Sequence, residues 1–383
     1  MLKYSFKNDY SEMAHPAILK ALADVGEVQF EGYGLDAYSM RAISLIRDEI
    51  GRDDAEIHFI SGGTPANLVV LSSLLRPHEA VIAADTGHIT THETGAIEAT
   101  GHKICQIETT DGKITLDRIA EVVKNHGDEH MVKPRVVFIS FSTEIGTLYS
   151  RQELADLALC CRKNHLLLYV DGARLGAGLY SSYSDVTIGD IAHYADCFYI
   201  GGTKNGALFG EAIVLLNPHI KQDFRYILKQ KGGLLAKGAV LGRQFETFFT
   251  PFHCGKTGAG SEIPISGSQM SDSKSDRSDS NCGMPKPKHL YEELASHAFI
   301  MAMRLRDGIR ALGYSFLSDA VTNQIFPIFP EEVVLKLERH YSFHRWMQME
   351  NNDIVLRLVT SWATPEAKVD EFLENLKFFT IRN

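Results

Sequence analysis

A lysine and an aspartate each follow an apolar segment that has the composition of a buried strand. Asp171 comes directly after residues 166–170, and Lys204 follows residues 197–200 within the glycine-rich stretch Gly201-Gly-Thr-Lys-Asn-Gly206. Open α/β sheets bind ligands beyond the carboxyl ends of their strands, so both side chains are expected at one rim. A desolvated lysine forms Schiff bases with carbonyl compounds, and flanking glycines let a bulky ligand approach the backbone. The alternative is a buried ion pair with no catalytic role.

A glycine turn offers a place for a phosphate group. The sequence Ser61-Gly-Gly-Thr-Pro-Ala-Asn67 follows an apolar run and has Pro65 where the first turn of a helix would begin. Exposed N–H groups at a helix start bind phosphate, although an ordinary capped helix would show the same residues. The stretch is neither a P-loop nor G-x-G-x-x-G. Together with Asp171 and Lys204, it indicates a phosphate-bearing aldehyde cofactor with a ring nitrogen.

Composition and charge restrict the partners. The formal net charge is −9, and no basic patch offsets it, so neither nucleic acid nor an anionic membrane is expected as a partner. No run approaches the ~20 apolar residues that span a bilayer, and the polar start lacks a secretory signal. The six cysteines include no CxxC pair and are typical of reduced thiols.

The two histidines His88 and His92 could suggest a metal site. They are followed by a single acid, Glu93, and this is not the His-Glu-x-x-His order, so no metal is predicted. We expect a cytoplasmic enzyme.

Short apolar segments alternate with helical patterns in the first two thirds of the chain. Residues 117–124 and 153–160 carry apolar side chains at helical spacing and are predicted crossover helices. Strands that are apolar throughout are typical of a mainly parallel sheet covered on both faces, and the fold class is therefore α/β. The predicted strands are residues 57–60, 80–83, 103–107, 136–139, 166–170, 197–200 and 212–216.

Three segments are predicted along the chain. Residues 1–246 form an N-terminal segment and a large domain, which ends in a helical region interrupted by Gly232-Gly233. Residues 250–288 contain a serine-rich run that lacks the apolar surface needed to fold, so we interpret them as a disordered insertion. Residues 289–383 form a smaller α+β domain. Its predicted elements are helices at 290–312, 331–339 and from 365 onward, and a strand at 354–360.

Six motifs occur in a characteristic order: Gly32-Tyr-Gly-Leu-Asp36, residues 61–67, Gly87-His-Ile-Thr-Thr-His-Glu-Thr-Gly-Ala96, Asp171-Gly-Ala-Arg174, Gly202-Thr-Lys204 and Arg357-Leu-Val-Thr-Ser-Trp362. In this order they resemble the threonine aldolase and β-eliminating lyase group of fold-type I enzymes, which depend on pyridoxal 5′-phosphate (PLP). The resemblance covers nearly the whole chain except the serine-rich insertion. It is closest to the branch found in trypanosomatid protists and some bacteria.

The resemblance implies how the cofactor would be held. Lys204 would bind PLP as a Schiff base, and Asp171 would keep the pyridine nitrogen protonated. Gly63 and Thr64, with Thr203, would bind the phosphate. A protonated ring is an electron sink for a bond that breaks at Cα.

Further residues would contact the ring or the substrate. His88 would stack on the ring, and Arg174 would lie beside its O3′ oxygen. Arg357 would bind the substrate carboxylate as a fork, which suits a planar anion better than a lysine does. Asn8 would contact the substrate, and Tyr33 would reach the site from a second subunit, because the family builds its sites at a dimer interface.

Two stretches depart from the pattern usual in this family, and the residue that binds the phosphate is left open. Lys7-Asn8-Asp9 stands where Arg-Ser-Asp is usual, and Ser142-Thr143-Glu144 stands where many threonine aldolases have a His after an Asn-Thr pair. The basic residue that would bind the phosphate is either Lys231 or Lys237. Cleavage also requires a general base near the substrate hydroxyl, and both Glu144 and His88 are candidates.

The leading hypothesis is a lyase that cleaves the Cα–Cβ bond of threonine or allo-threonine to glycine and an aldehyde. The runner-up is PLP-dependent β-elimination, with an aminotransferase as a third possibility. A non-enzymatic PLP-binding scaffold is the remaining alternative, which the Schiff-base lysine argues against. The expected assembly is a homodimer or homotetramer.

Overall fold

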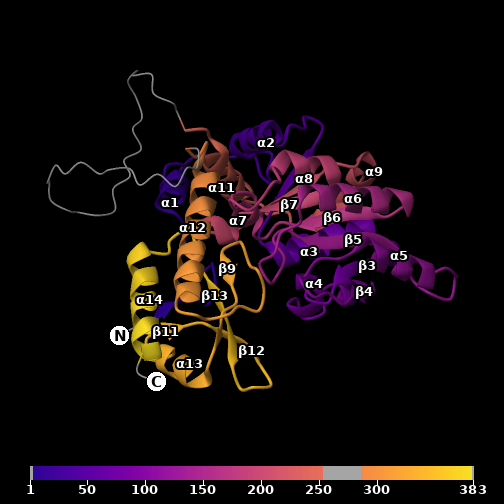
Figure 1. Ribbon diagram of the computed structural model, residues 1–383. Helices are drawn as coiled ribbons and strands as arrows, with labels where there is room; N and C mark the ends of the chain where they lie inside the picture. The colour runs from indigo at the N-terminus through magenta and orange to yellow at the C-terminus, as the bar shows by residue number, and fades with distance from the viewer. Residues whose placement is uncertain (1–2, 253–285, 382–383) are drawn as a thin grey trace.

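A seven-stranded sheet forms the centre of the larger part of the chain in the computed structural model, which describes residues 3–252 and 286–381 (Figure 1). The strand order is β2-β8-β7-β6-β5-β3-β4. Pairing is parallel from β4 through β7, and only β8 runs antiparallel to its two neighbours, β7 and β2. The strands are β2 (Glu56–Ile60), β3 (Glu79–Ala84), β4 (Ile104–Ile107), β5 (Lys133–Ser140), β6 (Leu167–Asp171), β7 (Cys197–Gly201) and β8 (Glu211–Leu215).

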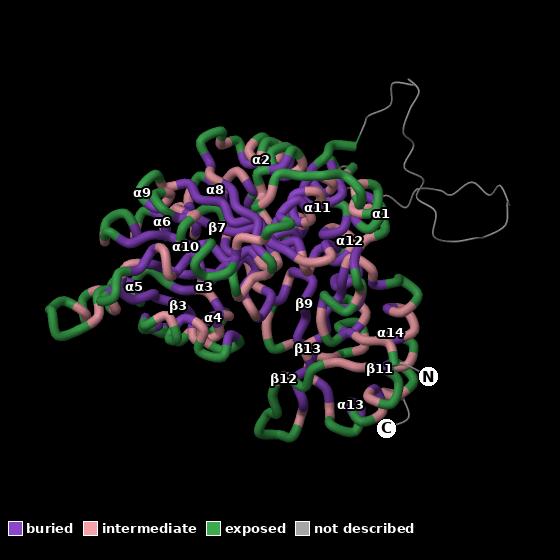
Figure 2. Tube along the Cα trace, turned by 180° about the vertical axis from the view of Figure 1, so that it is seen from behind, coloured by how far each residue is buried: buried purple, intermediate pink, exposed green. Residues whose placement is uncertain are grey.

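Helices cover both faces of this sheet, which explains why its strands are apolar throughout. Along β5, Val137 and Ile139 join one hydrophobic cluster, whereas Val136 and Phe138 join the cluster on the opposite face. The helices of this region are α1 (Pro16–Ala23), α2 (Ala37–Ile50), α3 (Gly63–Leu74), α4 (His88–Thr91), α5 (Leu116–Asn125), α6 (Arg151–Lys163), α7 (Leu175–Leu179), α8 (Ile188–Tyr194), α9 (Pro218–Lys221), α10 (Phe224–Gln230) and α11 (Ala239–Phe249). Figure 2 shows the buried interior that results.

A smaller sheet with its own hydrophobic cluster lies in the C-terminal part (Figure 1). Strand β13 (Ile354–Val359) pairs antiparallel with β10 (Ile328–Phe329), β12 (His344–Gln348) and β9 (Gln324–Ile325). The start of the chain joins this part, because β1 (Tyr4–Ser5) pairs with β11 (Tyr341–Ser342) and Phe6 lies in the same cluster. The helices here are α12 (Leu290–Ala311), α13 (Glu331–Leu337) and α14 (Glu366–Ile381).

The predicted α/β class with a mainly parallel sheet is confirmed, and each of the seven predicted strands overlaps an observed strand. The helical region predicted to be interrupted at Gly232-Gly233 is two helices, α10 and α11, with Gly232 in the left-handed region at φ +78°. The insertion predicted at 250–288 lies outside the described residues except at its ends. The domain boundaries stay a prediction. Among the described residues, no helix is long and apolar enough to cross a membrane.

Candidate active site

The loops that carry Asp171 and Lys204 lie in direct contact. Strand β6 ends at Asp171, and the 3-10 turn Thr203–Asn205 follows β7. The N–H of Gly201 donates to the carbonyl of Gly172 at 3.0 Å. A Cβ atom on Gly172 would lie 1.7 Å from the Tyr199 carbonyl oxygen, so a larger residue there would push the loops apart. The glycines therefore bring the two functional side chains to one rim of the sheet.

A cavity at this rim joins five of the predicted site residues. It encloses ≈ 260 Å³ of space between atoms, part of it open to solvent. Burial, together with the nearby charge of Arg174, lowers the pKa of Lys204 below that of an ordinary lysine. A larger neutral fraction suits an amine that must react with a carbonyl group. The lining residues are His88, Ser140, Ser142, Glu144, Asp171, Ala173, Arg174 and Lys204.

Three donors hold the Asp171 carboxylate, which is only 3% exposed. The Tyr199 hydroxyl donates to Oδ1 at 2.5 Å, and the Ala173 N–H donates to the same oxygen at 2.9 Å. The Asn67 amide donates to Oδ2 at 3.1 Å. These bonds fix the carboxylate where it can accept from a protonated ring nitrogen.

His88 and Glu144 are held together at the other wall of the cavity. The backbone N–H of His88 donates to Glu144 Oε1 at 2.9 Å, and the Ser140 hydroxyl donates to the same oxygen at 2.6 Å. Burial raises the pKa of Glu144, and the neighbouring Asp171 adds to the shift although the Ser140 bond opposes it. His88 Nδ1 lies 2.8 Å from Glu93 Oε1.

The predicted phosphate site is an open helix N-terminus near Asp171. Helix α3 begins at Gly63, and no side chain caps it at Gly62. A Cβ built on Gly63 would lie 3.0 Å from the Tyr199 hydroxyl, the group that donates to Asp171. Uncapped N–H groups with a positive helix end attract a phosphate. Thr203 Oγ1 accepts from the Gly210 N–H at 2.9 Å and is therefore partly engaged.

The two arginines of the predicted site, Arg174 and Arg357, are both half-buried. The Arg174 guanidinium donates two bonds to Asp9, at 2.7 and 3.0 Å. Arg357 donates to the Lys7 carbonyl at 3.4 Å, and its buried Nε has no hydrogen-bond partner among the described residues. Burial, with the nearby charge of Arg174, lowers the pKa of Arg357. The Asn8 side-chain oxygen accepts from the Tyr10 N–H at 3.0 Å and from the Ser11 hydroxyl at 2.9 Å.

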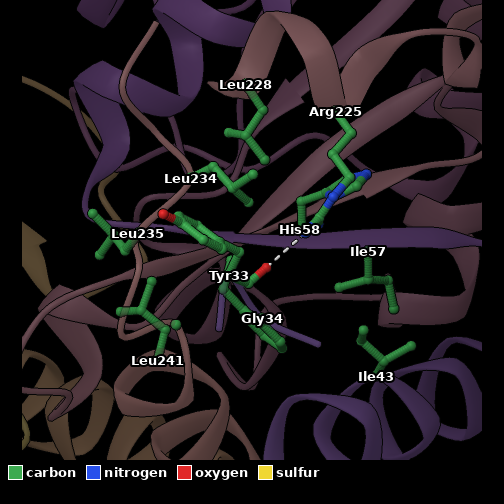
Figure 3. Close-up of a pocket in the computed structure, with 12 residues that line it drawn as sticks. Tyr33, Gly34, Ile43, Ile57, His58, Arg225, Leu228, Leu234, Leu235 and Leu241 are labelled. Carbon is green, nitrogen blue, oxygen red and sulfur yellow. Dashed lines mark hydrogen bonds between the residues drawn. The ribbon is translucent and has the colours of Figure 1, made fainter. Parts of the chain in front are cut away.

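Tyr33 is not brought to the Lys204 cavity of its own chain. It lines a second cavity, shown in Figure 3, with Leu228, Leu234 and Arg225. Its φ of 62° lies in the left-handed region, and its carbonyl accepts from Arg225 at 2.9 Å. The residue is 40% exposed. This cavity holds no lysine–aspartate pair and is distinct from the candidate active site.

The two lysines considered for the phosphate do not line the Lys204 cavity either. Lys231 and Lys237 are both exposed. The Tyr33 N–H donates to the Ala236 carbonyl at 3.1 Å, so Lys237 and Tyr33 belong to one surface.

Several polar residues of the site were missed from the sequence. The sequence motifs that contain Asp9 and Asn67 indicate no role for either residue, and the pattern around Glu93 indicates only a possible metal ligand. Tyr199 lies in β7, before the turn that carries Lys204, and its sequence position does not distinguish it from other aromatic residues of a buried strand. Glu211 is 4% exposed, accepts from the Gly202 N–H at 2.7 Å, and burial raises its pKa to about 7. An acidic residue at the start of the apolar strand β8 is the sequence feature that could have indicated a role for Glu211.

The residues present fit PLP. Asp171 lies where it can pair with a ring nitrogen, Lys204 shares its cavity, and the uncapped start of α3 is adjacent. Ser142 Oγ lines the cavity without a partner among the described residues. Within those same residues, no group of three or more His, Cys, Asp or Glu side chains is arranged to hold a metal ion.

Solved structures with this fold include an aspartate aminotransferase from Thermus thermophilus, which is 14% identical over 98% of this chain and 91% of that one, with a TM-score of 0.66. The protein is a PLP-dependent enzyme of fold type I. A family model described as beta-eliminating lyase matches residues 13–329. The chain belongs to this family of PLP-dependent lyases.

Two relatives are similar over much of their length. A threonine aldolase structure from Leishmania major is 40% identical, covers 98% of this chain and 99% of that chain, and has a TM-score of 0.87. A low specificity L-threonine aldolase from Pseudomonas aeruginosa is 33% identical over 61% of this chain and 67% of the relative.

Proposed function

We propose that this protein cleaves the Cα–Cβ bond of β-hydroxy-α-amino acids, converting threonine or allo-threonine to glycine and acetaldehyde. The similarity to threonine aldolases, over 98% of the chain for the Leishmania major structure and 61% for the Pseudomonas aeruginosa relative, supports this substrate class. The observation that carries the proposal is the cavity that Lys204 and Asp171 share with His88 and Glu144. Two groups able to accept a proton lie there beside the cofactor residues, as removal of a β-hydroxyl proton requires. No observation favours β-elimination over this reaction.

The cofactor residues have separate tasks in this proposal. When bound, PLP withdraws electrons from the bond that breaks at Cα. Lys204 would hold the cofactor covalently, and Asp171 would accept a hydrogen bond from its ring nitrogen. Gly63, Thr64 and Thr203 would bind the phosphate at the start of α3, where N–H groups are uncapped.

Arginine residues orient the substrate. The Arg357 guanidinium, whose Nε has no partner among the described residues, would donate to the carboxylate as a fork, and this would fix which bond at Cα lies perpendicular to the ring. Arg174 is held rigidly by Asp9, so it would present its remaining donors beside the O3′ oxygen of the cofactor. Asn8 would add a contact from the N-terminal segment.

His88 is the stronger candidate for the general base. Glu144 Oε1 already accepts two hydrogen bonds, one of them from the His88 backbone. The raised pKa of Glu144 also reduces its anionic fraction, although it brings the group closer to the range useful for proton transfer. Glu144 would then act mainly by holding the loop that carries His88.

A second copy of the chain would complete the site. Tyr33 is exposed yet rigid, because Arg225 binds its carbonyl and Lys229 Nζ lies 4.3 Å from its ring centroid. Large apolar side chains on either side of Tyr33 in the sequence are also exposed. Exposed apolar side chains are expected where a surface is covered in an oligomer. The exposed side chains are Tyr10, Met13, Leu19, Val28, Phe30, Leu35 and Met40. We propose a homodimer, alone or paired into a homotetramer, in the cytoplasm.

Product analysis tests the proposed function. Purified protein with PLP and L-threonine is expected to release glycine and acetaldehyde in equal amounts, and Lys204→Ala is expected to release neither. L-serine is the companion substrate, because β-elimination would yield pyruvate and ammonia from it. Pyruvate formation from L-serine without glycine formation from L-threonine would overturn the proposal in favour of an eliminating lyase.

A further inference from the structure

Glu93 is a buried acid that the reaction described above does not use. It follows α4, its side chain is 0% exposed, and its Oε1 lies 2.8 Å from His88 Nδ1. The same oxygen accepts from the Asn67 amide at 2.7 Å. Its Oε2 has no hydrogen-bond partner among the described residues. Burying a carboxylate with one oxygen unsatisfied is unfavourable, so its placement beside His88 calls for a compensating interaction.

Asn67 determines the direction of the bond between Glu93 and His88. Its NH₂ group donates to two carboxylates, Glu93 and Asp171, and an ionised carboxylate can only accept hydrogen bonds. Its carbonyl oxygen accepts from the Tyr169 hydroxyl at 2.8 Å, which fixes the amide orientation. Glu93 Oε1 is therefore an acceptor toward both of its neighbours. His88 Nδ1 must be the donor, which leaves Nε2 as the acceptor on a ring that lines the Lys204 cavity.

We propose that Glu93 is a positioning residue for His88: it holds the ring in the Nδ1–H tautomer and stabilises the imidazolium that forms when Nε2 takes the substrate hydroxyl proton. This inference rests on the proposed function. The hydroxyl oxygen keeps its electron pair, which becomes the second bond of the aldehyde carbonyl as the Cα–Cβ bond breaks. One proton is then delivered to Cα, so that glycine and acetaldehyde together contain every atom of threonine.

Other charged groups also face His88, and a variant must leave them unchanged. Glu93→Gln does so, because Asn67 still donates to the amide oxygen and keeps it turned toward Nδ1. The substitution removes the charge but retains the shape and the hydrogen bond. The other groups are Glu144 before α6, Asp171 at the end of β6, Arg174 and Lys204 at the cavity wall, and His92, whose ring centroid is 5.7 Å away.

The expected effect of Glu93→Gln is on turnover and its pH dependence. We expect kcat to fall by roughly 10–100-fold, with KM for L-threonine and the cofactor spectrum nearly unchanged. The acidic limb of the kcat profile should move to lower pH, since the imidazolium loses its anionic partner. Glu56→Gln is the matched control, because His58 Nε2 lies 2.7 Å from Glu56 Oε1 outside the Lys204 cavity. This control should leave kcat and the pH profile unaltered.

Two further measurements separate positioning from a structural role. In a His88→Phe background, Glu93→Gln should cause no additional loss, because the group it acts on is gone. Equal losses in both backgrounds would overturn the proposal. Ring ¹⁵N chemical shifts of wild-type protein, assigned by loss of the signal in His88→Phe, should show the Nδ1–H tautomer with and without PLP.

The nitrogen spectra can be recorded on protein that is not turning over substrate, and they do not require that the Glu93→Gln variant folds. An Nε2–H tautomer in the wild type would overturn the proposal even if threonine is cleaved. If wild-type protein shows the Nδ1–H tautomer but does not cleave threonine, the proposed function is wrong, and the failure is distinguishable from that of the Glu93–His88 pair.

Discussion

The pair between Asp9 and Arg174 makes a quantitative prediction about stability. Asp9 is 0% exposed and accepts two bonds from Arg174 and one from Asn323, at 2.9 Å. In Asp9→Asn only one oxygen remains, and the buried guanidinium loses its counter-ion. Breaking a buried pair from one side costs about 3–5 kcal/mol. With ~2.1 cal/mol/K of unfolding entropy per residue, a chain of 383 residues should lose about 4–6 °C in Tm.

The pH dependence follows from the pKa of Asp9. Burial acts to raise it, but the charges of Arg174 and Lys204 and the hydrogen bonds outweigh burial, so the pKa of Asp9 is lowered. A lowered folded-state pKa means that the stabilisation is fully present above the unfolded value of about 3.9 and is lost as pH falls through the folded value. The Tm difference between wild type and Asp9→Asn should therefore be constant from pH 8 to 5 and shrink below about pH 4.

Thermal unfolding followed by circular dichroism measures this difference. Asp370→Asn is the matched control, because Arg304 makes the same two-bond contact to Asp370 while both side chains are 43% exposed. An exposed pair contributes about 0–1 kcal/mol, so Tm should fall by about 1 °C or less. Equal losses for the two variants, or a difference that narrows between pH 8 and 6, would refute the reasoning about burial.

The remaining predictions concern catalysis. Asp171→Asn should keep PLP bound but lower kcat by roughly 10²–10³-fold, the scale of one preorganised electrostatic group; unchanged turnover at saturating PLP would show a purely structural role. Arg357→Lys should raise KM for L-threonine about 10–100-fold and spare the cofactor spectrum, and an unaltered KM would mean that another group binds the carboxylate. His88→Phe should lower kcat by roughly 10²–10⁴-fold, whereas Glu144→Gln should lower it less than about tenfold; the opposite order would make Glu144 the base.

The sheet could be predicted because its strands are buried on both faces. An apolar run such as residues 136–139 predicts such a strand even when the adjacent strands are not known. Strand β12 and the pairing of β1 with β11 could not be predicted in this way. Strand β12 is mostly exposed, and β1 gains its partner from more than 300 residues away in the chain. Such long-range pairing cannot be predicted from the local sequence pattern.

The site was predictable where a residue type is rare in its setting. Lys204 between glycines and Asp171 after an apolar strand are such cases, and the structure places both in one cavity. The role of Asp9 could not be predicted, because its partners are distant in the chain: Arg174 lies 165 positions later and Asn323 lies 314 positions later. The contact between Glu93 and His88 could not be predicted either, because the turn after α4 that brings the two side chains together has no helical or strand periodicity in its sequence.

The fate of the Cα–Cβ bond tests the central claim most directly. Uniformly ¹³C-labelled L-threonine, incubated with the PLP-loaded protein, can be followed by NMR through the coupling between Cα and Cβ. The proposed reaction predicts that this coupling disappears as two doubly labelled products, glycine and acetaldehyde, form at equal rates, and that Lys204→Ala shows no change. A four-carbon 2-oxo acid in which the Cα–Cβ coupling survives would contradict the account.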